Sequence, residues 1–181
     1  MELLRAECLI RQPDVIMIAE SFARNDISDA YLSIGGYQTI CRREGRDTAG
    51  GRGRGLLVYV REGISAAELV LEGGDLVTEC CGVTIPWERG GGNQVGAGLQ
   101  TTEDSRQPSR WWEHREAVQP FQEPGGRVVV LGDFKLPKTD WTRGWSTCAG
   151  ERMVVDTVGE MFWHPLVTEP THRLGNTLDC V

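Results

Sequence analysis

The sequence predicts an α/β sandwich in which two packed sheets carry few and short helices. Apolar segments of strand length recur along the chain, at residues 15–19, 37–41, 56–60, 76–85 and 127–131, whereas helical spacing is confined to 3–11 and 154–162. Strands that alternate with so few helices favour a sandwich over a doubly wound sheet. With 181 residues, 40% hydrophobic and 25% charged, the chain has the size and composition of one globular domain.

The N-terminal elements have the clearest signals. Leu3, Leu4, Cys8 and Leu9 repeat at helical spacing, and Pro13 ends that helix because proline cannot continue it. Residues 15–19 form a continuous apolar run of five, which is typical of a strand buried on both faces. We therefore expect a helix followed at once by an interior strand.

The remaining elements are placed by composition. A Gly/Arg-rich connection at residues 45–55 separates two expected strands and predicts no regular structure. The strand at 127–131 runs into Gly132 and Asp133, and residues 178–181 begin a last strand. Pro86 to Arg110 shows little apolar periodicity, and a structureless stretch of this length is unusual within a compact domain.

Charge limits the possible partners. The net charge of −7 argues against a general nucleic-acid coat protein, because phosphate contacts come from lysine and arginine. Between residues 42 and 61, however, six arginines face only two acids. This segment, which includes Arg52 and Arg54, is either a phosphate-binding patch or a solvated loop.

The cysteines and the apolar segments indicate the compartment. The six cysteines lack CxxC spacing, and the adjacent pair Cys80-Cys81 suits a disulfide framework poorly, so we interpret them as unpaired thiols in a reducing compartment, nuclear or cytoplasmic. No apolar run approaches the ~18–20 residues needed to cross a bilayer. The first residues also lack the zones of a signal peptide. We expect no membrane association.

Two acids stand at the ends of predicted strands. Glu20 follows the run at 15–19, and Asp133 follows the run at 127–131. Ligand sites of open α/β folds form at the carboxyl ends of strands, and Mg²⁺ prefers carboxylate oxygens together with water and phosphate oxygens. An acid at a strand end is more often a turn former, so each residue alone is a weak signal.

Several motifs in order resemble one family. The run that ends in Glu20-Ser21, the segment Gly132-Asp133-Phe134, and the later elements Asp140-Trp141 and Leu178-Asp179 resemble endonuclease/exonuclease/phosphatase domains. They are most similar to the endonuclease domains of non-LTR (LINE-type, chicken-repeat) retrotransposons. The resemblance covers residues 1–85 and 127–181 and treats the chain as a single partial domain. It implies a DNase I-like α/β/β/α sandwich that is incomplete at both ends, because the first family strand would precede Met1 and the closing Asp-His pair would follow Val181.

The resemblance also implies roles for individual residues. Glu20 would hold a Mg²⁺ or Mn²⁺ ion, Asp133 would orient or deprotonate the attacking water, and Asp179 would align a catalytic histidine. The implied reaction is hydrolysis of a DNA phosphodiester to leave a 3′-hydroxyl, which in the parent element would serve a reverse transcriptase domain. Lys135, Arg52 and Arg54 are candidate contacts to substrate phosphate.

One departure from the family pattern bears on catalysis. The family has an asparagine where this chain has Lys135, so a phosphate- or water-binding amide is replaced by a cation. The first alternative to an active nuclease is therefore a remnant without turnover. A phosphatase of the same superfamily is the second.

The atypical segment at residues 85–126 has its own hypothesis. Read one nucleotide out of frame, permitted codons for residues 111–126 encode an amphipathic helix of the kind that the family places before the strand at 127–131. We hypothesise that residues 85–126 are an out-of-frame translation of a decayed element; the alternative is an ordinary divergent insertion.

The nucleotide sequence tests this hypothesis directly. We expect codons for residues 111–126 that encode the amphipathic helix after a shift of one nucleotide. Codons that do not yield it would leave the divergent insertion as the explanation.

Overall fold

The computed structural model describes residues 1–43, 55–69, 80–86, 93–99, 127–131, 136–167 and 169. Its elements follow in the order α1 (Glu2–Arg11), β1 (Val15–Ala19), α2 (Asp29–Leu32), β2 (Tyr37–Arg43), β3 (Leu56–Arg61), β4 (Ala67–Leu69), β5 (Cys80–Pro86), β6 (Asn93–Leu99), β7 (Arg127–Leu131), β8 (Thr139–Asp140), β9 (Trp145–Ser146) and α3 (Ala149–Glu160).

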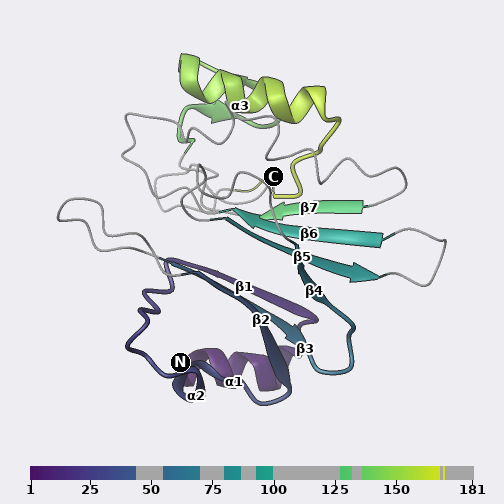
Figure 1. Cartoon of the computed structure of the whole chain (residues 1–181). Coiled ribbons are helices and arrows are strands. Elements are labelled where there is room, and N and C mark those ends of the chain that lie inside the picture. The colour runs from purple at the N-terminus through teal and green to yellow at the C-terminus, as the bar shows by residue number, and fades with distance from the viewer. Residues whose placement is uncertain are drawn as a thin grey trace.

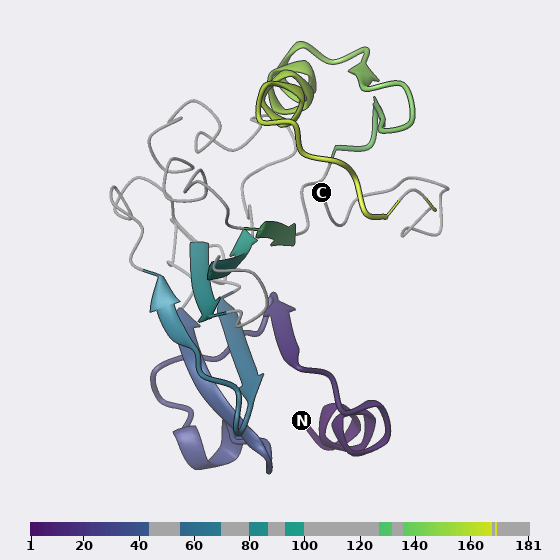
Figure 2. The ribbon, with the colours of Figure 1, turned by 90° about the vertical axis from the view of Figure 1, so that its right-hand side faces the viewer.

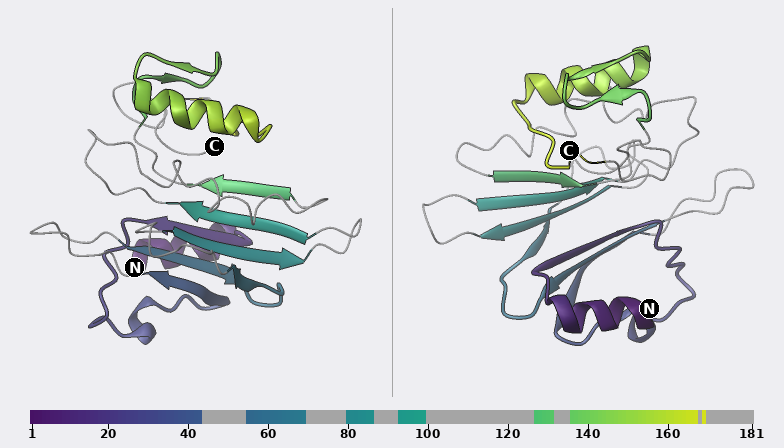
Figure 3. Two further views of the ribbon diagram at one scale, coloured as in Figure 1. Left: turned by 45° about the horizontal axis from the view of Figure 1, so that its top comes forward. Right: turned by 180° about the vertical axis from the view of Figure 1, so that it is seen from behind.

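Two sheets form the centre of the fold (Figure 1). The first has the order β1-β3-β2 and is antiparallel throughout. The second has the order β4-β5-β6-β7, and only its β6–β7 pair is parallel. α1 and α2 cover the outer face of the first sheet, and α3 lies beyond the second sheet (Figures 1 and 3). The predicted α/β/β/α sandwich is confirmed.

Strand β3 supplies side chains to both faces of the first sheet. Leu57 and Tyr59 point toward the helices, whereas Leu56, Val58 and Val60 point toward the second sheet, and all five are buried. Successive side chains of a strand face opposite sides, so an uninterrupted apolar sequence fills two cores at once. The view turned by 90° shows these layers edge-on (Figure 2).

The core between the helices and the first sheet includes one buried hydroxyl. Tyr59 is fully buried and donates a hydrogen bond from its hydroxyl to the carbonyl oxygen of Leu32, 2.9 Å away. Burial raises the pKa of the Tyr59 phenol above its ordinary value of 10.0. The phenol is therefore held as a neutral donor that ties α2 to β3.

Strand β1 was predicted to be buried on both faces, and this is only partly correct. Ile16 and Ile18 pack with the helix-side core, and Val15 and Met17 pack with the inter-sheet core, but these side chains remain half-exposed. Among the described residues β1 pairs with β3 alone. The apolar run correctly predicts a strand at these residues. It does not indicate how many strands pair with β1.

A bulge in β2 directs a cysteine into the inter-sheet core. The register of β2 on β3 shifts between Thr39 and Cys41, so Thr39 pairs with Tyr59 and Cys41 pairs with Val58. Without the extra residue Ile40, Cys41 would face the helices. The bulge instead places its side chain opposite the second sheet.

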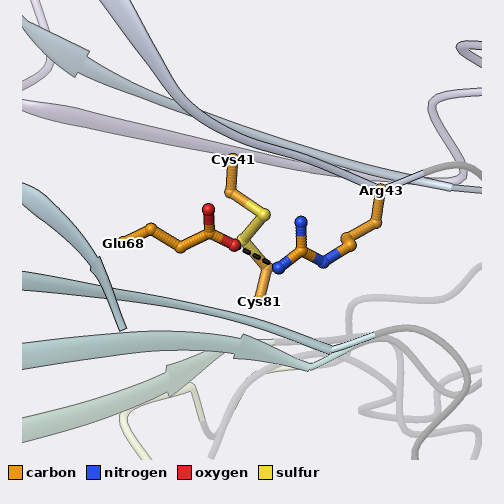
Figure 4. The surroundings of a disulfide bond; sticks show 4 residues. All are labelled: Cys41, Arg43, Glu68 and Cys81. Atoms are coloured by element: carbon orange, nitrogen blue, oxygen red, sulfur yellow. Dashed lines mark hydrogen bonds and ion pairs between the residues drawn. A yellow bond between two sulfur atoms is a disulfide. The ribbon is translucent and has the colours of Figure 1, made fainter. Parts of the chain in front are cut away.

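There Cys41 forms a disulfide with Cys81 of β5, which joins the two sheets (Figure 4). The prediction that the cysteines are unpaired thiols is therefore wrong for this pair, although it is correct for Cys8 and Cys148. The chain-entropy model assigns such a cross-link, 40 residues apart in sequence, a stabilisation of roughly 4 kcal/mol. Spacing in the sequence could not reveal the pair, because the contact is made between sheets.

Other expected elements are found with shifted bounds. The strand expected at 76–85 is observed from Cys80, because residues 70–79 lie outside the described part, and the helix expected at 154–162 begins at Ala149. Strand β6 lies inside the segment for which no regular structure was expected. The connection at 45–54 and the strand at 178–181 fall outside the described residues.

Candidate functional site

Glu20 occupies the first position after β1, with a backbone unlike that of the strand. Its φ is 52°, in the left-handed region that residues other than glycine seldom adopt. The following amide, that of Ser21, donates to the carbonyl oxygen of Gly55 at 3.1 Å, immediately before β3. The carboxyl end of β1 is thus anchored to the start of β3 while the chain turns away at Glu20.

Arg42 fixes the loop that follows Glu20. Its guanidinium donates to the carbonyl oxygens of Arg24 and Ile27, the latter at 2.9 Å, and forms an ion pair with Asp29 at 2.5 Å. Only 20% of the Arg42 side chain is exposed, because the loop folds over it. Arg42 of β2 therefore connects the backbone between Glu20 and α2 to the first sheet.

This role changes the interpretation of the arginine-rich segment. Arg42 is engaged by the loop, Arg43 pairs with Glu68, and Arg61 pairs with Asp14. These three members of the expected phosphate-binding patch have partners within the chain. Arg52 and Arg54 lie outside the described residues.

The two strands that carry the predicted acids end on the same side of the sandwich. β1 and β7 run in the same direction, and their carboxyl ends lie at one edge of the two sheets (Figures 1 and 3). Glu20 follows β1 directly, and Asp133 is two residues beyond the end of β7 in the sequence. Asp133, Lys135 and Asp179 lie outside the described residues.

Glu20 has suitable chemistry for a hard cation. A half-buried carboxylate at a strand end offers the oxygen ligands that Mg²⁺ and Mn²⁺ prefer. Left-handed backbone at a non-glycine residue costs about 1–3 kcal/mol and is concentrated at functional sites. Gln12, Phe22 and Phe162 also have positive φ, and among these residues Glu20 alone carries a carboxylate.

A second polar centre was missed by sequence reasoning. Glu151 of α3 is 6% exposed, and its Oε2 accepts hydrogen bonds from the amide of Lys138 at 3.0 Å and from the hydroxyls of Thr139 at 2.8 Å and Ser146 at 2.9 Å. These three donors belong to the β8–β9 region, so the carboxylate joins that hairpin to α3. A buried acid with so many donors is a structural anchor. A lone glutamate in the first turn of a helix gives no such signal in sequence.

A pocket of about 460 Å³ lies in the same outer layer, between α3 and the hairpin. Two tryptophans, Trp141 and Trp163, and two acids, Asp156 and Glu160, are among the residues that line it. Trp141, which belongs to the Asp140-Trp141 element that resembles the family, therefore lines a pocket. This pocket belongs to the α3 layer, whereas Glu20 lies at the end of β1.

Comparison with known proteins places the whole arrangement in one family. The model of the Endonuclease/Exonuclease/phosphatase family matches residues 1–179. No curated protein sequence matches the chain. None of the helices in the described part of the chain has the length and apolar character needed to cross a bilayer.

Solved structures agree on the fold. The endonuclease domain of TRAS1, a telomere-specific non-LTR retrotransposon, has a TM-score of 0.61 at 16% identity, over 98% of this chain and 75% of that domain. AP endonuclease LMAP from Leishmania major scores 0.60 at 16% identity, over 98% and 71%. A mannosyl-6-phosphatase of Bacteroides thetaiotaomicron scores 0.52 at 12% identity, over 85% and 60%. At these identities the likeness concerns the fold.

The backbone at Glu20 leads to a stability prediction. Glu20→Gly should be more stable than Glu20→Ala by about 1 kcal/mol, because glycine adopts positive φ without the steric cost that alanine incurs. Both variants lose the carboxylate, so its contacts cancel in the comparison. Urea unfolding of the two variants measures the difference.

Ser21 is the matched control, because its φ is not positive. There glycine should be less stable than alanine, because it loses more conformational freedom on folding. Equal stabilities for the two Glu20 variants, or a more stable alanine variant, would contradict the strained backbone.

Proposed function

The chain belongs to the endonuclease/exonuclease/phosphatase family, and we propose that it is a divalent-metal-dependent phosphodiesterase that cleaves DNA and leaves a 3′-hydroxyl. The observation that carries this proposal is the position of Glu20, a carboxylate on strained backbone at the edge where β1 and β7 both end. The proposed setting is the nucleus or the cytoplasm.

Each acid of the proposed site would have a different role in catalysis. Glu20 would bind Mg²⁺ or Mn²⁺, and such an ion supplies Lewis-acid stabilisation of charge that develops on a phosphoryl oxygen. Asp133 would orient or deprotonate the attacking water, and Asp179 would align a catalytic histidine. Lys135, Arg52 and Arg54 would contact substrate phosphate as cations.

The contacts that Arg42 makes with the loop after Glu20 support this assignment. A metal ligand must be held close to its productive position, and the neighbours that fix it matter almost as much as the ligand. Arg42 provides such a support by binding two loop carbonyls and Asp29. The strand, the turn and the clamped loop together fix the backbone on both sides of the carboxylate.

DNA is the proposed substrate on two grounds. The sequence motifs are most similar to retrotransposon endonuclease domains, and the TRAS1 endonuclease domain has the same fold. A reverse transcriptase domain in a parent element is the corresponding proposed partner. The same fold in a mannosyl-6-phosphatase keeps a small-molecule phosphate monoester as the alternative substrate class, and Lys135 keeps a remnant without turnover as the other alternative.

A plasmid-nicking assay tests the proposal. The protein should convert supercoiled DNA to open circles with Mg²⁺ or Mn²⁺, and the activity should disappear with a chelator. Glu20→Gln should lower the nicking rate by about a hundredfold or more, because it removes a charged ligand. A DNA polymerase should extend the nicks without phosphatase treatment if they end in a 3′-hydroxyl.

Glu62→Gln, an exposed carboxylate just after β3, is the matched control and should nick at the original rate. A protein that folds but does not nick, or that nicks equally well after Glu20→Gln, would refute the proposal. Hydrolysis of a small phosphate monoester without nicking would support the phosphatase alternative instead.

A further inference from the structure

Three potential metal ligands meet at the junction between the two sheets. The sulfur atoms of Cys41 and Cys81 and a carboxylate oxygen of Glu68 all lie within 4.8 Å of one another. They come from β2, β5 and β4, so three separate strands bring them together (Figure 4). It is the one such group of His, Cys, Asp or Glu side chains in the described part of the chain.

The composition of this group selects one class of ion. Two cysteines and a carboxylate match zinc, which binds thiolate sulfur at about 2.3 Å and carboxylate oxygen at about 2.0–2.2 Å. Mg²⁺ and Ca²⁺ require oxygen ligands, so they do not suit a group that contains two sulfurs. Three protein ligands leave the fourth tetrahedral position to water.

The sulfurs become ligands only after reduction. A dithiol reductant would give two electrons and two protons to the Cys41–Cys81 bond and would itself become a disulfide. Binding of the divalent cation then releases the two thiol protons, because thiolate is the ligand. In the reducing compartment proposed above, thiols are the favoured state of such a pair.

The surroundings suit an ion in this place. The Cα atoms of the two cysteines are 6.6 Å apart, at the wide end of the roughly 4.4–6.8 Å found for disulfides, so the separated sulfurs have room to reach the ~3.7 Å expected of two thiolates on one tetrahedral zinc. Both cysteines are at most 2% exposed, whereas 33% of the Glu68 side chain is exposed. The ion would thus enter on the Glu68 side.

We propose that the reduced chain binds one Zn²⁺ ion through Cys41, Cys81 and Glu68, which joins the two sheets in place of the disulfide. This site is independent of the proposed phosphodiesterase site, and its test does not depend on nuclease activity. The reduced chain keeps a cross-link between its sheets as long as zinc is present.

Arg43 lies next to the proposed metal ligands. Its guanidinium forms an ion pair with Glu68 beside the sulfurs (Figure 4). It therefore competes with the metal for the same carboxylate and places a positive charge near the ion. Removal of the arginine should tighten metal binding, whereas removal of the glutamate should weaken it.

Cobalt titration tests the site. The full chain is reduced with a phosphine, freed of metal by a chelator and titrated with Co²⁺, whose thiolate complexes have a near-ultraviolet charge-transfer band. We expect one equivalent to bind, Zn²⁺ to displace it, and the disulfide form to show no band. Glu68→Gln should bind at least about tenfold more weakly, and Arg43→Gln several-fold more tightly.

Cysteine variants locate the ion. Cys41→Ser should abolish the band, whereas Cys8→Ser, Cys148→Ser and Cys80→Ser should retain it. The absence of a thiolate–cobalt band in the reduced protein would overturn the proposal. Unchanged binding in Cys41→Ser or in Glu68→Gln would also overturn it. Glu68 and Arg43 are partly exposed, so variants of these two residues still test the site if Cys41→Ser does not fold.

Discussion

The alternation of side chains along β3 is the constraint on which the rest of the fold depends. Leu57 and Tyr59 complete the core under the helices, and Leu56, Val58 and Val60 complete the core between the sheets. β3 also pairs with both β1 and β2, so it sets the position of every strand in its sheet. The direction of Cys41 follows from its register on this strand.

Much of this fold could be predicted from local signals. The apolar run of β1, the proline after α1 and the β-branched residues of β7 define their elements without help from distant residues. The exceptions depend on contacts between elements. The bulge at Ile40 and the Cys41–Cys81 bond require the two sheets to be in place, and β6 has glycines at Gly96 and Gly98 that weaken a strand pattern.

In the candidate site, too, local features could be predicted from the sequence, whereas features that depend on contacts between elements could not. The carboxylate of Glu20 was predicted from its place at a strand end, but its positive φ and the clamp by Arg42 were not, because both result from loop packing. Arginines look alike in sequence whether they face solvent or bind carbonyl groups. For that reason the predicted patch included Arg42, Arg43 and Arg61, which have partners within the chain. Glu151 escaped notice because its donors come from a hairpin that forms only in the fold.

Native-state hydrogen exchange tests the central role of β3 most directly. The amides of residues 57–60 should be among the slowest in the protein, and their exchange free energy should equal that of global unfolding, because opening β3 breaks both cores. The β1 amides should exchange somewhat faster, since that strand is half-exposed. Exchange of the β3 amides through local opening, at a free energy well below that of global unfolding, would contradict the account.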